Sequence, residues 1–472
     1  MALETEVLII GAGPGGYPAA IRAAQLGKKV VIVDKGFLGG ECLNWGCIPS
    51  KALISASKLY HTINHDAYKM GIMVEKSSIN MEKLQEWKNG IVSNLKNGIR
   101  QLFKAHKIQY LEGTATLEGR YSAKIKLNDG KEETIRFNYC ILATGASFIS
   151  LPNIKIDEEK ILSARGALAL SKVPKHLVCI GGGVIGIELG TVFAKLGAKV
   201  SIIEFMPEIL PGVEKRIVNV VKKKLKALGV EIYTSSEAKT VEILKTKMKL
   251  KVKTPKGEMQ LEPDKILLSI GKRANTGSLG LEKAGIKTDE KGFIKVDKQL
   301  RTNVPHIFAI GDCTGGPFLA HRSTKHGIIA AEVLAGLKSE VDFVTIPTAI
   351  FSDPEIAVAG ITEEEAKKKG MKVVTSRASF GASGRAMSQL ETDGFVKLIA
   401  DPENNVLLGA EIVGPHASDL ISEIALALEM GATVEDVGYT VHPHPTLPEM
   451  IMEAAESIEG KAIHVPNVRK KK

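Results

Sequence analysis

Two cysteines, Cys42 and Cys47, stand with four residues between them in the segment GGECLNWGCIPSK, residues 39–51. Such a pair could help to bind zinc, pack as inert core thiols or cycle between dithiol and disulfide. Zinc needs four ligands at suitable spacing, and the other three cysteines are scattered through the chain. The segment predicts a loop that leads into a helix, and a helix N-terminus favours a thiolate. The sequence therefore favours a redox-active disulfide without a metal.

The elements that could position this pair belong to a unit that occurs twice. Residues 7–34 and 177–204 each read as an apolar strand, a G-x-G-x-x-G turn, a helical stretch and a second apolar strand that ends in an acid. Matching residues are offset by 170 positions: Gly11 and Gly181, Gly13 and Gly183, Gly16 and Gly186, Asp34 and Glu204.

Each residue type in this unit has a physical reason. The first glycine permits a tight turn, the second lets the backbone approach a pyrophosphate, and the third lets the helix pack close to the strand. The helix N-terminus then faces the phosphates, and the acid accepts from a ribose hydroxyl. Two units predict two dinucleotides. At the second site Glu204, followed by FMPEILPG without an arginine, favours NAD over NADP.

The cysteines belong to only one of the two units. CILATGA (140–146) closes the first unit and KILLSIGK (265–272) closes the second. From the acid to the closing strand, the first unit is about 45 residues longer, and the cysteine pair and a helical region around 80–105 lie in that excess. We therefore expect the pair to work beside the nucleotide of the first unit.

The composition is that of a multi-domain globular protein. The chain has 472 residues, 44% hydrophobic and 25% charged, with a net charge of +10. It has no run of 18 apolar residues and no recognisable signal peptide, so we expect no membrane-spanning helix. Five cysteines do not make a secreted disulfide framework, which favours a reducing, cytoplasmic compartment. Basic residues cluster only in RKKK (469–472), so we expect no nucleic-acid or membrane partner.

The motifs together resemble one family. GGECLNWGCIPSK, the two nucleotide units, ILATGA and IFAIGDC (307–313) are similar to those of the pyridine nucleotide-disulfide oxidoreductases, in the same order. HPHPTLPEM (442–450) is similar to the branch that oxidises dihydrolipoyl groups with FAD and NAD+. The resemblance implies an α/β fold of two Rossmann-like dinucleotide-binding domains plus a C-terminal α+β dimerisation domain. The expected domains are FAD-binding (1–150), NAD-binding (151–275), a central segment completing the FAD site (276–345) and an interface domain (346–472).

The resemblance also implies roles for individual residues. Cys47 would face the flavin and Cys42 would exchange with substrate, while Lys51 would lie near flavin N5 and pair with Glu188. The residues expected to bind FAD are Gly11, Gly13, Gly16, Asp34, Gly113, Thr144, Gly145, Asp312 and Ala320, besides Lys51. Those expected to bind NAD are Gly181, Gly183, Gly186, Glu204 and Gly271.

A histidine–carboxylate pair would complete the site. By resemblance His444 is the base and Glu449 its orienting partner, and they serve the disulfide of the other subunit of a homodimer. A neutral histidine can take a thiol proton near pH 7, and a carboxylate fixes its tautomer. His442 is a close rival for this role. The implied protein partners are lipoyl domains, either of the acyltransferases of 2-oxo acid dehydrogenase complexes or of the carrier protein of glycine cleavage.

Some residues depart from the family's pattern. Glu41 stands where a small hydroxylic residue is usual, Trp45 replaces an aliphatic residue, and KRANT (272–276) replaces an Arg-Pro pattern. Asp34 is shorter than the usual Glu, and Pro18 lies early in the first nucleotide helix, where it predicts a late start or a kink. Two other readings remain open: another NAD(P)H-dependent disulfide reductase of the same family, and a non-catalytic flavoprotein scaffold.

Overall fold

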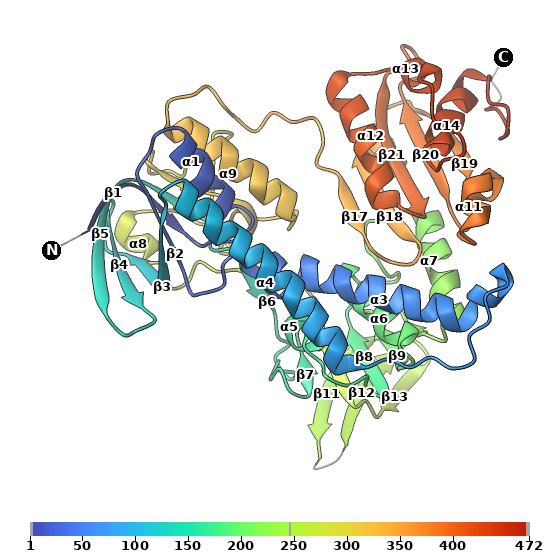
Figure 1. The fold of residues 1–472 in the computed structure, drawn as a ribbon, viewed down its shortest axis with the longest axis horizontal. Helices are drawn as coiled ribbons and strands as arrows, with labels where there is room; N and C mark the ends of the chain where they lie inside the picture. Colours follow the sequence, from blue (N-terminus) through green and yellow to red (C-terminus); the bar gives the residue numbers. More distant parts are fainter. Residues whose placement is uncertain (1–2, 245–246, 469–472) are drawn as a thin grey trace.

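The computed structural model describes residues 3–244 and 247–468, so the basic run 469–472 lies outside the described residues. Figure 1 shows three bodies: the first nucleotide unit at the left, the second at the lower centre, and the C-terminal residues at the upper right. Two long helices, α3 (Cys47–His65) and α4 (Met81–Ala105), run across the molecule between them. The helical region expected around 80–105 is therefore confirmed.

The first sheet carries the first nucleotide unit. Its strands β3, β2, β1, β5 and β16 are parallel neighbours in that order, and β4 pairs antiparallel with both β3 and β5. The bounds are β1 (Leu3–Ile10), β2 (Val30–Asp34), β3 (Gln109–Leu117), β4 (Ser122–Leu127), β5 (Glu132–Leu142) and β16 (Ile307–Ala309). Where these strands pair in parallel, the segments 7–10, 30–33 and 140–142 are continuous apolar runs and almost wholly buried, as expected for strands covered on both faces. Helices α1 (Gly16–Gln25) and α9 (Ala320–Leu334) pack together on one face.

The second sheet is wholly parallel, with the order β10-β9-β8-β14-β7. Its bounds are β7 (Ile161–Leu162), β8 (His176–Ile180), β9 (Lys199–Ile203), β10 (Glu231–Tyr233) and β14 (Lys265–Leu268). Helices α5 (Ala164–Leu168), α6 (Val184–Lys195) and α7 (Lys215–Ala227) accompany it, with an antiparallel meander of β11 (Glu237–Ile243), β12 (Met248–Thr254) and β13 (Gly257–Leu261). Two short antiparallel strands, β6 (Ala146–Phe148) and β15 (Lys272–Ala274), pair where the chain passes between the two units.

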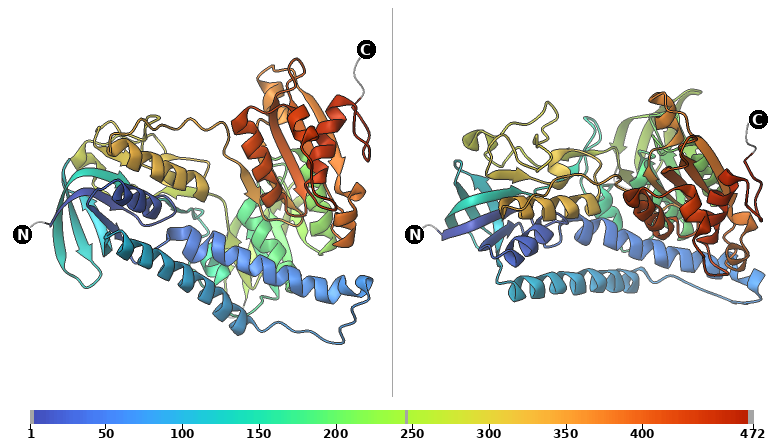
Figure 2. Two further views of the ribbon diagram at one scale, coloured as in Figure 1. Left: turned by 45° about the horizontal axis from the view of Figure 1, so that its top comes forward. Right: turned by 90° about the horizontal axis from the view of Figure 1, so that it is seen from above.

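The C-terminal body is a five-stranded antiparallel sheet with the order β17-β18-β21-β20-β19. Its strands are β17 (Thr348–Ile350), β18 (Glu355–Gly360), β19 (Val374–Ser379), β20 (Phe395–Ala400) and β21 (Leu407–Gly414). Helices α12 (Ala417–Met430) and α14 (Glu449–Glu459) pack on this sheet, and α13 (Val434–Tyr439) packs on α14. Figure 2 shows the long connection from α9 to this body. The predicted fold class is confirmed, whereas the exact domain limits stay a prediction.

Pro18 and Cys42 each lie in a helix of the first unit. Helix α1 begins at Gly16, so Pro18 falls in its first turn, where a helical residue needs no N–H donor. The proline thus does not delay the helix. Cys42 lies in a short helix, α2 (Gly40–Trp45), and not in the loop that the sequence predicted. Only Gly46 separates α2 from α3. Among the described residues, we find no helix that combines the length and apolar character needed to cross a membrane.

Candidate active site

The glycines of the first turn have separate physical reasons. Gly11 has φ +104°, and a Cβ there would overlap the carbonyl oxygen of Ala143. A Cβ on Gly16 would overlap the carbonyl of Gly11. Gly13 differs, because its φ is ordinary and a Cβ would meet only the Cα of Gly40, at 3.7 Å. The chain itself therefore does not require glycine at position 13, which fits a bound group that approaches the backbone there.

The second turn repeats this pattern. Gly181 has φ +105° and Gly186 lies against the carbonyl of Gly181, so neither has room for a side chain. A Cβ on Gly183 would meet nothing within 4 Å. Both turns lie at the carboxyl ends of parallel strands, before α1 and α6, where dinucleotides bind in such sheets. The residues present therefore fit two dinucleotides.

The acid of each unit braces its own turn. The carboxylate of Asp34 accepts from the N–H groups of Ala12 at 2.9 Å and Phe37 at 2.7 Å. Glu204 accepts from the N–H groups of Gly182 at 2.6 Å and Met206 at 2.7 Å. Each carboxylate oxygen has a second lone pair, so these bonds leave room for a ribose hydroxyl.

The cysteine pair lies directly against the first turn. Gly40, the first residue of α2, approaches Gly13 so closely that a side chain on it would overlap the turn. Cys42 lies in α2, and Cys47 is the first residue of α3, at its positive end. Both are thiols in this structure and both are partly buried.

The two thiols have opposite acidities. A hydrogen bond from the Cys42 thiol, together with the charge of Lys51, lowers the pKa of Cys47 to about 7, although burial opposes this. The same hydrogen bond, and then burial, raises the pKa of Cys42. Of the pair, Cys47 is therefore the thiolate and Cys42 keeps its proton. The predicted roles, with Cys47 facing the flavin and Cys42 exchanging with substrate, stay a prediction.

Lys51, on α3 one turn after Cys47, is half-buried and forms an ion pair with a buried carboxylate. Its Nζ lies 2.9 Å from the carboxylate of Glu188 in α6, and only 7% of the Glu188 side chain is exposed. The second oxygen of Glu188 accepts from the N–H of Phe351 at 2.9 Å, and Lys51 also lies 4.2 Å from the centre of the Phe351 ring. The predicted Lys51–Glu188 pair is thus present in the structure. Sequence reasoning missed Phe351, because nothing near position 351 indicates a contact with residues 51 and 188.

The two rival histidines have different environments. His444 Nδ1 lies 2.8 Å from Glu449, and 82% of the His444 side chain is exposed. Its Nε2 has no hydrogen bond to a described residue. Burial opposes ionisation of Glu449, but hydrogen bonds from the Thr446 N–H and from His444 lower its pKa overall. One ring nitrogen of His444 is therefore held by Glu449, while the other has no partner among the described residues.

His442 has no such freedom. Its Nε2 lies 2.9 Å from Glu423 and its Nδ1 lies 2.7 Å from the carbonyl of Thr440. Only 5% of its side chain is exposed. The hydrogen bond that His442 donates to Glu423 raises the pKa of His442, although burial opposes it. Both ring nitrogens are occupied, so the contacts of His442 are structural.

The other residues expected at the cofactors fall into two groups. Gly113 lies in β3, where a side chain would meet the Lys126 carbonyl at 2.6 Å, so packing alone explains that glycine. The buried Thr144 hydroxyl, in contrast, has no hydrogen-bond partner of ordinary geometry among the described residues, which leaves it available to a ligand. The remaining four follow strands or begin a helix: Gly145 (φ +68°) after β5, Gly271 (φ +126°) after β14, Asp312 after β16 and Ala320 at the start of α9.

Trp45, which departs from the family's pattern, packs beside the cysteines against aromatic and cationic neighbours. Its ring meets Phe37 edge to face at 4.7 Å. The guanidinium of Arg165, from α5, lies 4.7 Å from the Trp45 ring centre. The larger side chain is therefore accommodated by a stacked arginine from the second unit.

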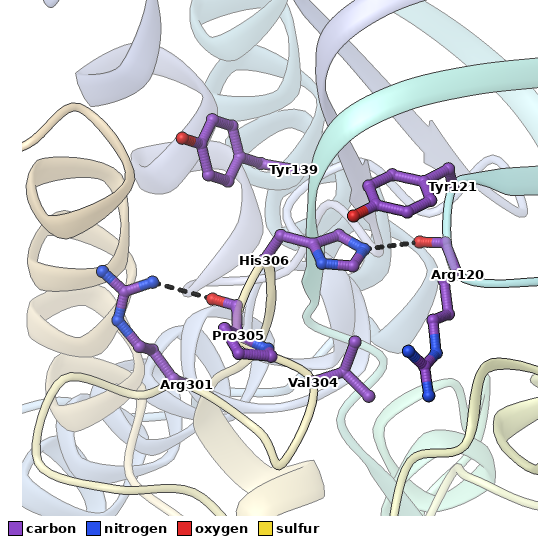
Figure 3. Close-up of a pocket in the computed structure, with 7 residues that line it drawn as sticks. All are labelled: Arg120, Tyr121, Tyr139, Arg301, Val304, Pro305 and His306. Carbon is purple, nitrogen blue, oxygen red and sulfur yellow. Dashed lines mark hydrogen bonds between the residues drawn. The ribbon is translucent and has the colours of Figure 1, made fainter.

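A surface pocket of about 350 Å³ lies away from these residues (Figure 3). It is found where the chain enters the amino end of β16, whereas the first glycine turn follows the carboxyl end of β1. Inside it, the Tyr121 ring stacks on His306 at 4.1 Å. Its lining residues are Arg120, Tyr121, Tyr139, Arg301, Val304, Pro305 and His306. None of them is a predicted site residue.

Comparison with known proteins agrees with this geometry. Residues 5–327 match the family model of the pyridine nucleotide-disulphide oxidoreductases, and residues 346–455 match that family's dimerisation domain. The dihydrolipoyl dehydrogenase of Geobacillus stearothermophilus is 48% identical over 464 residues, 98% of each chain. That of Haloferax volcanii is 44% identical over 471 residues, 99% of each chain.

Solved structures give the same result. LpdA from Mycobacterium tuberculosis superposes with a TM-score of 0.89 at 27% identity, covering 96% of this chain and 99% of that one. The HOCl-induced flavoprotein disulfide reductase RclA from Escherichia coli gives 0.85 at 26% identity, with the same coverage. The dimerisation-domain match also supports a homodimer. The chain therefore belongs to the pyridine nucleotide-disulphide oxidoreductase family.

Proposed function

We propose that the chain works as a dihydrolipoyl dehydrogenase, which oxidises protein-bound dihydrolipoyl groups to lipoyl groups and reduces NAD+. In balance, one dithiol and one NAD+ give one disulfide, one NADH and one proton. The observation that carries this proposal is the Cys42–Cys47 pair, which packs on the first glycine turn and has the Lys51–Glu188 ion pair one helical turn away. Relatives that are dihydrolipoyl dehydrogenases support it over nearly the full chain.

The chain's own residues would divide the work as follows. His444 takes the proton of one substrate thiol at Nε2, while Glu449 holds Nδ1 and stabilises the imidazolium. The substrate thiolate attacks Cys42, the bond between the two cysteines breaks, and Cys47 leaves as a thiolate. The second substrate thiol then displaces Cys42, so that the substrate departs as a disulfide and the enzyme holds a dithiol. Such a stored intermediate gives ping-pong kinetics.

The chain uses FAD and NAD, in keeping with its family. Bound FAD supplies a carrier that takes an electron pair from the dithiol and passes it to NAD+ as hydride. The residues that would hold it are the first glycine turn, Asp34, Thr144, Asp312 and the N-terminus of α9. Gly183 and Glu204 would hold NAD. Lys51 would place a positive charge beside the flavin, and the buried Glu188 would orient it.

The proposed site needs two subunits. His444 lies in the C-terminal body and is exposed, whereas Cys42 and Cys47 lie in the first unit and are partly buried. We propose that each His444 serves the cysteine pair of the other subunit. The exposed apolar side chains of the C-terminal body fit a contact between subunits, and include Leu426, Met430, Tyr439 and Val441. The protein partners would be lipoyl domains of acyltransferases or of the glycine cleavage carrier, in the cytoplasm.

The decisive test is an absorption spectrum of the purified protein during anaerobic titration with dihydrolipoamide. We expect a yellow protein whose flavin spectrum changes on addition of the dithiol and returns with NAD+. A protein that takes up no FAD, or whose bound FAD does not respond to dihydrolipoamide, would contradict the proposal.

A second candidate is reduction of another disulfide by NADH. The likeness to a flavoprotein disulfide reductase at TM-score 0.85 favours it as the alternative. Separate assays with lipoamide, glutathione disulfide and coenzyme A disulfide would distinguish the two. Turnover of glutathione or coenzyme A disulfide well above that of lipoamide would support the second candidate.

A further inference from the structure

Two residues that depart from the family's pattern are partners in the structure. Glu41 and Lys272 are 231 positions apart in sequence, yet Lys272 Nζ lies 2.5 Å from Glu41 Oε1. The pair is mostly buried, with 15% of the Lys272 side chain and 25% of the Glu41 side chain exposed. A buried, short ion pair between two unusual residues indicates that each accommodates the other.

The pair lies between the redox helix and the proposed flavin site. Glu41 directly precedes Cys42 in α2, whereas Lys272 begins β15, which pairs with β6 where the chain passes between the two units. Lys272 Nζ also lies 4.0 Å from Asp312 Oδ2 and 5.4 Å from the ring centre of Phe148. One cation thus stands between two carboxylates, one beside the cysteine pair and one in the loop after β16.

Both carboxylates depend on this cation. Burial raises the pKa of Glu41, and Lys272 acts against that effect. Burial likewise raises the pKa of Asp312, and the charges of Lys272 and Arg322 act against it. Without Lys272 two buried carboxylates would face each other, which is costly in a medium of low dielectric constant. Lys272 therefore supplies a positive charge between the two carboxylates, and Glu41 neutralises part of that charge.

We propose that Lys272 and Glu41 form a positioning pair that sets the reduction potential of the bound flavin. This inference rests on the proposed function, because that function assigns Asp312 to the ribityl chain of FAD. Reduction brings negative charge into the flavin site, so a nearby cation stabilises the reduced form and a nearby carboxylate destabilises it. The cation of Lys272 raises the reduction potential of the flavin and the carboxylate of Glu41 lowers it. With both residues present, the two effects largely cancel.

The test compares four proteins with FAD bound: the unmodified chain, Lys272→Met, Glu41→Gln and the double variant. The equilibrium constant for reduction of the flavin is measured against an indicator dye during anaerobic reduction. We expect Lys272→Met to lower this constant roughly tenfold and Glu41→Gln to raise it a few-fold, since the electrostatic effect grows in partly buried sites. The double variant should return toward the unmodified value, because the two single substitutions shift the constant in opposite directions.

Two further variants serve as controls. Lys272→Arg keeps the cation and should keep the equilibrium constant, whereas a loss caused only by packing would appear in it as well. Lys247→Met removes a cation from an exposed pair with Glu262, at 3.4 Å, and should change nothing. The Gln and Arg variants carry the test if Lys272→Met does not fold.

Unchanged constants in the single variants, or a double variant whose constant stays as low as that of Lys272→Met alone, would overturn the inference. The readout does not depend on substrate turnover. If the unmodified protein binds FAD but does not oxidise dihydrolipoamide, the proposed function fails, while the comparison of potentials still decides the role of this pair.

Discussion

The two glycine turns share a motif but differ in their surroundings. In the first, α9 covers the turn: Thr324 donates to the carbonyl of Pro14 at 2.9 Å, and Gly327 lies against the carbonyl of Gly15 without room for a side chain. An ion pair of 2.7 Å between Arg22 and Glu332 also holds α1 to α9.

The second turn is open. A Cβ on Gly183 would meet no described atom within 4 Å, and Val184 and Phe205 are 41% and 70% exposed. The first turn is thus covered by a helix about 310 positions later in the chain, whereas residues beside the second turn are exposed to solvent. This difference fits an FAD that stays bound and an NAD that exchanges with solvent. The same motif can serve both purposes because different segments of the chain surround the two turns.

The largest expected effect comes from the cysteine pair, which only the first unit contains. Cys42→Ser and Cys47→Ser should each abolish dihydrolipoamide oxidation, because neither can form the disulfide. Transfer from NADH to dyes should partly survive, since it needs only FAD and the second unit. In Cys42→Ser, long-wavelength absorption should appear without a reductant, because the Cys47 thiolate donates charge to the oxidised flavin. Absorption of this kind in Cys47→Ser instead would reverse the order of the two thiols.

A histidine from outside both units is expected to have the next largest effect. His444→Gln should lower dihydrolipoamide turnover about a hundredfold to ten-thousandfold, the usual range for loss of a general base. FAD content and NADH-to-dye activity should remain, because both units are intact. His442→Gln is the matched control and should retain most turnover, since its ring nitrogens already have partners. Equal losses of turnover in the two variants would contradict the assignment of His444.

The second glycine of each turn, Gly13 or Gly183, tests the difference between the two turns most directly. Gly13→Ala should weaken FAD retention and Gly183→Ala should raise the KM for NADH, each by roughly tenfold, or about 1.4 kcal/mol. Neither new methyl group overlaps a described atom, so both variants should fold. Gly11→Ala, which overlaps Ala143, should instead lower the thermal unfolding temperature. If Gly183→Ala weakened FAD retention and Gly13→Ala raised the KM for NADH, the two turns would be assigned the wrong way round.

Cofactor choice sharpens the comparison at the second unit. The unmodified protein should use NADH far better than NADPH, because the carboxylate of Glu204 repels a 2′-phosphate. Glu204→Gln should narrow the ratio of the two kcat/KM values, although it also weakens the turn by removing one acceptor for the Gly182 and Met206 N–H groups. Asp34→Asn, in the first unit, should leave that ratio unchanged. Equal use of both cofactors by the unmodified protein would refute this assignment.

The smallest expected effect is a pH dependence of the reduced protein. Cys47 has its pKa lowered to about 7, so its thiolate predominates above that pH and is lost as the pH falls through it. After reduction by two electrons, the long-wavelength absorption should therefore fade between about pH 8 and 6. A band that stays constant from pH 8 to 5 would mean that Cys47 remains ionised by contacts beyond Cys42 and Lys51.

Much of this molecule could be predicted from local sequence. The glycine spacing, the acid after each second strand and the apolar strands specify two dinucleotide units, because a tight turn and a close helix require glycine wherever they occur. The position of Cys47 at the start of α3 also follows locally, since Gly46 ends one helix and IPSKALISASKLY continues as another. The pairing of His444 with Glu449 spans only five residues, and the family resemblance identified it.

Contacts between distant segments could be decided only by the tertiary structure. No local pattern pairs Glu41 with Lys272, brings Phe351 to Glu188, or places α9 over the first turn. The packed structure also gives a physical reason to prefer His444 over His442, because His442 is buried with both ring nitrogens occupied, whereas His444 is exposed with one partner. Burial and charge balance depend on the whole fold, and they determine which cysteine ionises and which turn stays open to solvent.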